Sequence, residues 1–203
     1  MNIRSSVACA LVALVSASSA SASVGAFANQ VLWENYVSVK GYGVVEQQVG
    51  GRPQGHYASL TGSGGGINWT ATAKGGLLAG PDAMATFLVG DEVSLSVSFS
   101  PGVRAVGGSM FSRLFKDEAS PSLVEVYFAD GSSFSGFTFP SQEFLGFAST
   151  DRDIVGLTIS ALNPGDGTLA SPTIGSLYVG VIPAPGAVAV LGLAGLGGRR
   201  RRT

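Results

Sequence analysis

The sequence predicts an all-β fold: a single antiparallel β-sandwich of jelly-roll-like architecture, flanked by an N-terminal signal peptide and a short C-terminal hydrophobic helix. Three observations favour this fold. One segment alternates strictly between apolar residues and serines, a second has the pattern of a β-hairpin, and many short apolar runs are separated by glycine- and proline-rich breakers. Short strands at this spacing are typical of sandwiches.

The clearest strand covers residues 93–100, VSLSVSFS, in which Val93, Leu95, Val97 and Phe99 alternate with four serines. Because successive side chains of a strand point to opposite faces, one face of this strand is apolar and the other carries only hydroxyl groups. We therefore expect a half-buried antiparallel strand with the core on one side and solvent on the other.

A hairpin is predicted over residues 123–139, where Asp130-Gly131 can adopt the positive φ angles of a tight turn. Val124, Val126 and Phe128 share one face before the turn, and Phe137 and Phe139 share one face after it. Phe134 is out of phase with those two phenylalanines, so we expect a bulge near Gly136.

The remaining strands are expected at residues 31–37, 42–49, 67–73, 84–89, 103–111, 144–148, 154–160 and 174–180. The breakers between them are GGRPQG, TGSGGG, KGGLLAGPD, SPG, STDRD and NPGDG. GSGGG precedes a strand, so it is interpreted as a turn and not as a phosphate-binding loop. Only residues 111–118 have the pattern of a helical turn.

The N-terminus has the three-part pattern of a secretory signal peptide. Arg4 is followed by an apolar run over residues 7–17 and by the small residues Ala20-Ser21-Ala22. We expect signal peptidase to cut between Ala22 and Ser23, which gives three segments: signal peptide 1–22, β-sandwich domain 23–181 and C-terminal tail 182–203.

The tail has two prolines, an apolar run over residues 186–198 and then four consecutive arginines, Arg199, Arg200, Arg201 and Arg202. Thirteen helical residues span about 20 Å, which is short of a hydrocarbon core of roughly 30 Å. The arginines are expected to stay on the cytoplasmic side as a basic stop for a transient inner-membrane anchor.

This tail resembles the PEP-CTERM sorting signal of Gram-negative bacteria. Pro183 and Pro185 match the two motif prolines, whereas Ala184 stands where glutamate is usual. The resemblance implies that an exosortase-type membrane enzyme processes the tail. It also implies export, with the protein first anchored in the inner membrane and then placed at the cell surface or outside the cell.

Charge and cysteine content narrow the function classes. Five of the 12 basic residues lie in the two end segments, which leaves 7 against 13 acidic residues in the domain. An acidic domain repels phosphate backbones, so we expect no nucleic-acid partner. The only cysteine, Cys9, lies in the signal peptide, so the domain has no disulfide and no thiolate ligand.

The sequence predicts no catalytic residue, no metal site and no cofactor. His56 is the only histidine, and no nucleophile elbow, zinc motif or phosphate loop is present. Two alternatives stay open at this stage. A glycosidase could use one of the carboxylate pairs Asp91-Glu92, Asp117-Glu118 or Asp151/Asp153, and a calcium ion could bind STDRD or the Asn163/Asp166 loop.

The favoured hypothesis is a non-enzymatic exported protein associated with the cell surface, the extracellular matrix or exopolysaccharide. The alternative is a secreted carbohydrate-binding or carbohydrate-active protein. Aromatic residues with a polar group could provide a sugar-stacking surface, and the candidates are Trp33, Tyr36, Tyr42, Tyr57, Trp69, Tyr127 and Tyr178. The sequence shows no regular threonine-rich row of the kind that an ice-binding face needs.

Overall fold

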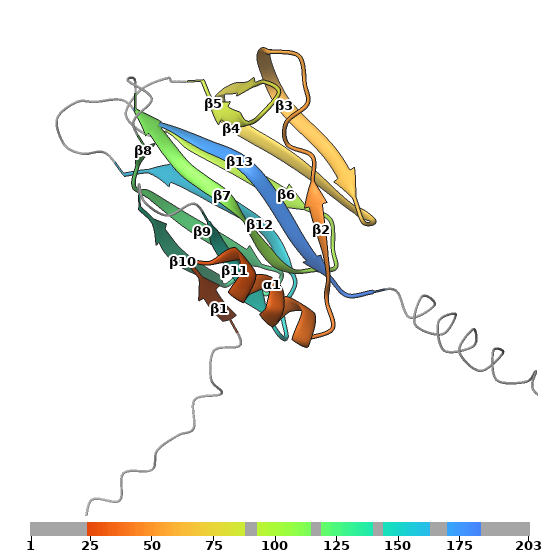
Figure 1. Cartoon of the computed structure of the whole chain (residues 1–203). Helices are drawn as coiled ribbons and strands as arrows, with labels where there is room; N and C mark the ends of the chain where they lie inside the picture. The colour runs from red at the N-terminus through yellow and green to blue at the C-terminus, as the bar shows by residue number, and fades with distance from the viewer. Residues whose placement is uncertain (1–23, 88–92, 115–118, 140–143, 163–169, 184–203) are drawn as a thin grey trace, which may run out of the picture.

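The structure is a computed structural model that describes residues 24–87, 93–114, 119–139, 144–162 and 170–183. The all-β prediction is confirmed, because this part of the chain folds into strands with one short helix (Figure 1). The elements are β1 (Val24–Phe27), α1 (Gln30–Val39), β2 (Gly43–Gln47), β3 (Gly55–Gly64), β4 (Ile67–Ala79), β5 (Met84–Thr86), β6 (Ser94–Phe99), β7 (Val103–Leu114), β8 (Ala119–Ser120), β9 (Ser122–Phe128), β10 (Ser133–Thr138), β11 (Leu145–Ser149), β12 (Ile154–Ala161) and β13 (Ala170–Val181).

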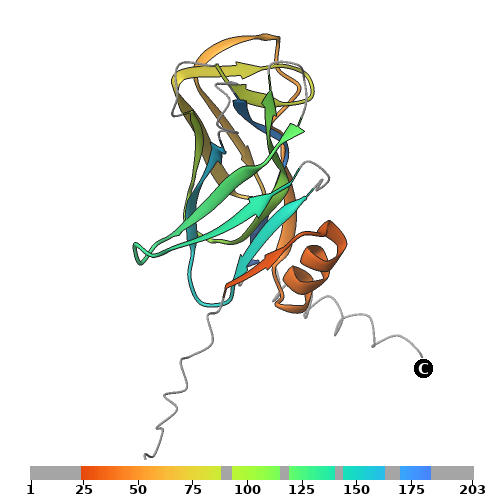
Figure 2. The ribbon, with the colours of Figure 1, turned by 90° about the vertical axis from the view of Figure 1, so that its left-hand side faces the viewer.

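The strands form one continuous antiparallel sheet that curls into a barrel-like sandwich (Figures 1 and 2). Its order is β1-β11-β7-β13-β5-β4-β6-β12-β9-β10, with β2 beside β13, β3 beside β4 and β8 beside β7. We call β3, β4, β6, β12, β9 and β10 the front layer; in Figure 1 the opposite side, which carries α1, is nearer the viewer. The back layer is β1, β11, β7, β13 and β2, and β5 joins the two through its pairing with β4 and β13.

The core lies between the two layers and draws on both. Leu95 and Val97 of β6 and Val124 and Val126 of β9 are buried in one cluster with residues of β7 and β13. Phe134 of β10 meets Phe147 of β11 edge to face, with ring centroids 6.0 Å apart, so the front layer closes onto the back. Aromatic pairs of this geometry favour close packing.

The alternating strand and the hairpin turn are confirmed. In β6 the apolar residues are buried and the serines point outward. Gly131 has a φ of 82°, and the amide of Phe128 donates to the carbonyl of Ser132 at 2.9 Å, which closes the turn. The expected bulge near Gly136 is wrong, because β10 pairs with β9 without a break from Ser133 to Thr138. Phe134 faces the core, and Phe137 points outward and is 52% exposed.

The strand expected at residues 31–37 is wrong, because this segment lies in helix α1. Asn29 is the N-cap, and its side chain accepts a hydrogen bond from the amide of Leu32, which satisfies a free donor of the first turn. Trp33 and Val37 are the two buried residues of the helix. Their spacing of four residues is that of one helical face, so this signal was present in the sequence.

Three strands, β1, β3 and the two-residue β8, were not expected, and β4 extends beyond the strand expected at 67–73. Strand β3 lies partly within the breaker TGSGGG. Gly65 and Gly66 of that breaker form the tight β3–β4 turn, both with positive φ angles, so its interpretation as a turn holds. Gly75 and Gly76 do not end β4. After them the strand pairs with β5 in place of β6, while β3 stays paired on its other side.

The other expected strands lie where β2, β4, β5, β7, β11, β12 and β13 are found. The helical turn expected at residues 111–118 is wrong at its beginning, because β7 continues to Leu114, and residues 115–118 lie outside the described residues. The signal peptide and the apolar tail also lie outside them, and the domain boundaries 23 and 181 stay a prediction. Within the described part of the chain, no helix is long and apolar enough to cross a membrane.

Candidate functional site

The outward side of the front layer carries rows of hydroxyl groups that cross the strands. Residues directly opposite each other in paired strands point to the same face, so the strand registers define the rows. The first row is Thr61, Thr70, Ser98, Gly156, Tyr127 and Ser133, and the second row is Ser59, Thr72, Ser96, Thr158, Glu125 and Ser135. We call this surface the hydroxyl face.

A third level of the hydroxyl face carries Ser94, Ser160, Leu123 and Phe137. Ser96 and Thr158 of the second row lie 3.1 Å apart, hydroxyl to hydroxyl, across β6 and β12. Neighbouring strands lie about 4.8 Å apart, so one outward side chain is presented at each such step along a row. The rows therefore form an ordered array of polar groups and not a scatter of surface serines.

A depression lies in the first row beside Tyr127. Its volume is about 260 Å³, and its floor includes Gly156, which places no side chain between Ser98 and Tyr127. The β12–β9 register shifts between Ile154 and Gly156, and this bulge brings Gly156 opposite Tyr127. A Cβ atom on Gly156 would lie 2.9 Å from the carbonyl oxygen of Val97, so glycine is needed here.

Tyr127, Glu125 and Ser133 form a hydrogen-bonded group at the edge of this depression. The Tyr127 hydroxyl donates to Oε2 of Glu125 at 2.8 Å, and the Ser133 hydroxyl donates to Oε1 at 2.7 Å. The Ser133 bond and then the Tyr127 bond hold the pKa of Glu125 below its ordinary value of 4.5, so its carboxylate is ionised at neutral pH. Burial, followed by the Glu125 bond, raises the pKa of Tyr127 above 10.0.

Of the aromatic residues proposed for sugar stacking, Tyr127 has the required placement. It is 37% exposed and lines the depression. Trp33 and Trp69 are wrong candidates because both are buried in the core clusters. The ring of Tyr57 packs against the main cluster, and Tyr36, Tyr42 and Tyr178 pack against the smaller cluster beneath α1.

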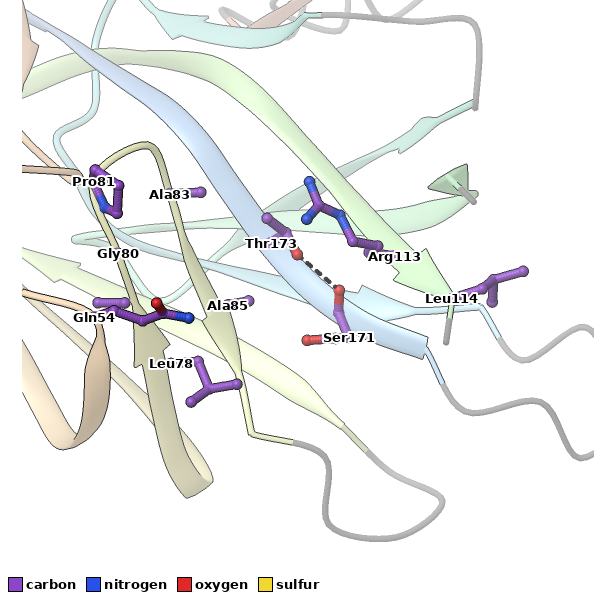
Figure 3. Close-up of a pocket in the computed structure, with 11 residues that line it drawn as sticks. Gln54, Leu78, Gly80, Pro81, Ala83, Ala85, Arg113, Leu114, Ser171 and Thr173 are labelled. Atoms are coloured by element: carbon purple, nitrogen blue, oxygen red, sulfur yellow. Dashed lines mark hydrogen bonds between the residues drawn. The ribbon is translucent and has the colours of Figure 1, made fainter. Parts of the chain in front are cut away.

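A second pocket of about 460 Å³ lies between β4, β5, β7 and β13 (Figure 3). Leu78, Pro81 and Leu114 are among its apolar lining residues. Its hydroxyl groups are already bonded within the fold, since Thr173 donates to the carbonyl of Ser171 at 3.0 Å and Ser171 donates to that of Thr86 at 2.8 Å. Gln54 and Arg113 also line this pocket. No exposed aromatic ring is among its lining residues, whereas the hydroxyl face presents Tyr127 beside its polar groups, so we take the hydroxyl face as the stronger candidate for a sugar site.

The residues weighed for catalysis or metal binding are held in structural contacts. His56 bonds through Nε2 to the carbonyl of Gly75 at 2.9 Å and packs its ring on Phe87. Asp153 forms an ion pair with Arg104 at 2.8 Å, and Asp151 lies 3.4 Å from Arg152. The ranges that the structure describes contain no group of three or more metal-ligating side chains.

Several sequence predictions cannot be placed. The pairs Asp91-Glu92 and Asp117-Glu118 and the Asn163/Asp166 loop lie outside the described residues. The same holds for Ala22 and Ser23 at the predicted cleavage site and for Ala184, Pro185 and Arg199 to Arg202 of the tail. Pro183 is the last described residue, and it is exposed two positions after β13 ends.

No protein-family model matches the chain, and no curated protein matches it. Two solved structures of family 29 carbohydrate-binding modules are similar to it. One is a mutant in complex with mannohexaose, 14% identical, with a TM-score of 0.31 over 68% of this chain and 90% of that chain. The other, from Piromyces equi, is 12% identical, with a TM-score of 0.31 over 68% and 89%. A likeness at this level of identity and TM-score carries no functional argument.

Proposed function

We propose that this chain is an exported, non-enzymatic β-domain that binds polysaccharide through the hydroxyl face and is associated with the cell surface or the extracellular matrix. The observation that carries the proposal is the depression beside Tyr127, bordered by two cross-strand rows of serine and threonine. A sugar ring has an apolar face and a rim of hydroxyl groups. An exposed tyrosine ring can stack on the apolar face of the sugar, and hydroxyl side chains can donate hydrogen bonds to the hydroxyl rim or accept them from it.

The arrangement supports binding in preference to hydrolysis. A glycosidase needs two carboxylates that face each other across the scissile bond, about 5 to 10 Å apart. The two rows contain one carboxylate, Glu125, whose two oxygens are already hydrogen-bonded to neighbours on the same face. Glu125 therefore has no partner acid within the rows, and the hydroxyl face is suited to holding a glycan chain.

The two chain ends support export. The segment before Val24 has a signal-peptide pattern ending at Ala22, and the segment after Val181 has a PEP-CTERM-like pattern. In this proposal signal peptidase cuts before Ser23, and the tail holds the domain at the inner membrane until an exosortase-type enzyme acts on it. Mass spectrometry of the protein recovered outside the cell tests both ends, and an intact Met1 or an intact arginine tail would contradict this part.

The binding proposal is tested by affinity electrophoresis in gels that contain a panel of soluble polysaccharides. Replacement of Tyr127 by Ala should weaken binding roughly tenfold, because the stacking surface is lost. Phe87→Ala is the matched control, since Phe87 is 45% exposed and lies after β5, away from the hydroxyl face. No retardation by any polysaccharide, or equal loss in the two variants, would contradict the proposal.

A further inference from the structure

We propose that the hydroxyl face selects neutral glycans, with the Glu125 carboxylate accepting hydroxyl groups of the sugar unit stacked on Tyr127 and excluding polymers that carry carboxylate, sulfate or phosphate groups. This inference rests on the proposed function and adds the ligand class. It follows from three features of the described residues: the free acceptor capacity of Glu125, the charges around it, and its position relative to the depression.

Glu125 has acceptor capacity that its neighbours do not use. A carboxylate has two oxygens with about four acceptor positions in all. Tyr127 occupies one position on Oε2 and Ser133 occupies one on Oε1, which leaves about one on each oxygen. Two adjacent sugar hydroxyl groups can fill such a pair. A sugar carboxylate, being an acceptor without a proton to donate, cannot.

The charges near Glu125 also favour neutral glycans over anionic glycans. Glu125 is the only ionisable acid or base among the residues of the two rows apart from the neutral phenol of Tyr127. Lys74, two residues beyond Thr72 on β4, lies three strand spacings from Glu125, about 14 Å away, which exceeds the Debye length of about 8 Å in physiological salt. Arg52 donates to the carbonyl of Thr61 at the far end of the first row.

The remaining cation near the hairpin, Arg152, does not offset Glu125. Its guanidinium lies over the ring of Phe128, which is a buried residue of the inner side of β9. It is also 3.5 Å from Asp130 and 3.4 Å from Asp151, two carboxylates that compensate its charge. Among the described residues, no cation near the Tyr127 depression therefore offsets the charge of Glu125, so an anionic glycan is repelled there and a neutral glycan is not.

The position of Glu125 places it within reach of a sugar on Tyr127. Both residues point outward from β9 two positions apart, and their side chains touch through the 2.8 Å hydrogen bond. Thr158 stands opposite Glu125 and lines the same depression. A ring stacked on Tyr127 therefore has its hydroxyl rim beside both the Glu125 carboxylate and the Thr158 hydroxyl.

The test compares polymers that share a backbone and differ in charge. The full chain is titrated with galacturonan and its methyl ester, with mannuronan and mannan, and with glucuronan and a 1,4-linked glucan, at low and at physiological salt. The wild type should bind the neutral member of the pair it recognises roughly tenfold more tightly, and salt should narrow the difference. The Glu125→Gln variant should show a smaller difference in affinity between the neutral and the anionic polymer at both salt concentrations. The Glu46→Gln variant, which changes an exposed acid of β2, should show the wild-type difference.

The outcomes separate the two proposals. Equal binding of both members of a pair, or a preference that Glu125→Gln leaves unchanged, overturns the selectivity while the binding function stands. Binding of neither member in any pair overturns both. Retained neutral binding after Tyr127→Ala, together with a charge preference that depends on Glu125, would place the carboxylate in the site but overturn the stacked sugar unit.

Discussion

The back and front layers of the sandwich differ in what their outward sides carry. On the back, helix α1 lies against the sheet (Figure 2). It covers Ala105 and Ala148 and buries Trp33 completely, and the Trp33 indole donates to the carbonyl of Phe147 at 3.0 Å. On the front, serines and threonines stand in rows, and none of the described helices or strands covers them, since their side chains are exposed or half-buried. Small apolar residues leave room for a helix, whereas hydroxyl side chains keep a surface hydrated and able to bind.

The glycines of the back show how closely the helix approaches. A Cβ atom on Gly146 would lie 2.6 Å from the Trp33 ring, and one on Gly180 would lie 3.0 Å from Val37. On the front, Gly156 has another role, because it opens a depression to solvent instead of admitting a packed side chain. The same residue type therefore serves packing on one outer face and, under the proposed function, ligand access on the other.

The largest expected effect is the difference between a substitution on the inward side of the front layer and one on its outward side. Val97 is 2% exposed and Ser98 beside it is exposed. Val97→Asp should prevent folding, because burying a charge costs several kcal/mol against a total stability of about 5–15 kcal/mol. Ser98→Asp should fold normally. Circular dichroism and urea unfolding of both variants check this, and a stable Val97→Asp domain would contradict the assigned core.

The next effect concerns the helix on the back. Trp33→Ala should lower the free energy of unfolding by about 3–5 kcal/mol, because it leaves a cavity over Gly146 and removes a buried hydrogen bond. Val39→Ala, at a helical position that is 83% exposed, should change it by less than about 0.5 kcal/mol. Chemical denaturation measures both, and similar losses in the two variants would argue against the packing of α1.

The next effect concerns Tyr127 and should appear in binding and not in stability. The Tyr127→Ala variant should bind polysaccharide roughly tenfold more weakly yet unfold at nearly the wild-type urea concentration, because Tyr127 lies on the outward side of β9. Tyr127→Phe should keep part of the binding, since the ring remains while the hydroxyl's hydrogen bonds with Glu125 and Thr158 are lost. A large loss of stability would mean that Tyr127 belongs to the core and not to a binding surface.

The smallest effect is expected within the rows themselves. Ser96 and Thr158 are joined across β6 and β12 at 3.1 Å. A double-mutant cycle with Ser96→Ala and Thr158→Val should give a coupling energy of about 0.5–1 kcal/mol in unfolding. A coupling indistinguishable from zero would show that the hydroxyl groups bond to water independently and are not an ordered array.

The sequence predicted the front layer well where the signal was local. The alternation in β6 identified both its core side and its hydroxyl side, and Asp130-Gly131 identified the hairpin. It failed for α1, because valine and tryptophan favour strands while the deciding contacts, Trp33 with Phe144 and Phe147, come from residues more than a hundred positions away. Tertiary packing overrode local propensity there.

The hydroxyl rows could not be predicted from the chain alone. Thr70, Ser98 and Tyr127 are neighbours on one face but come from separate strands, and their alignment depends on the pairings β4–β6–β12–β9. Tyr127 was one of seven aromatic candidates, and only the register places it beside Gly156. The expectation of no regular threonine-rich row does not conflict with the hydroxyl face, because its cross-strand rows mix serine and threonine with Gly156, Tyr127 and Glu125.

The most direct test of the central claim is an NMR titration of the isotope-labelled chain with an oligosaccharide that it binds. We predict that amide shifts concentrate at Thr70, Ser98, Glu125, Tyr127 and Thr158 on the hydroxyl face, while the amides of α1 and of the 460 Å³ pocket stay unchanged. Shifts that centre on α1 or on that pocket, with the hydroxyl face unaffected, would contradict it.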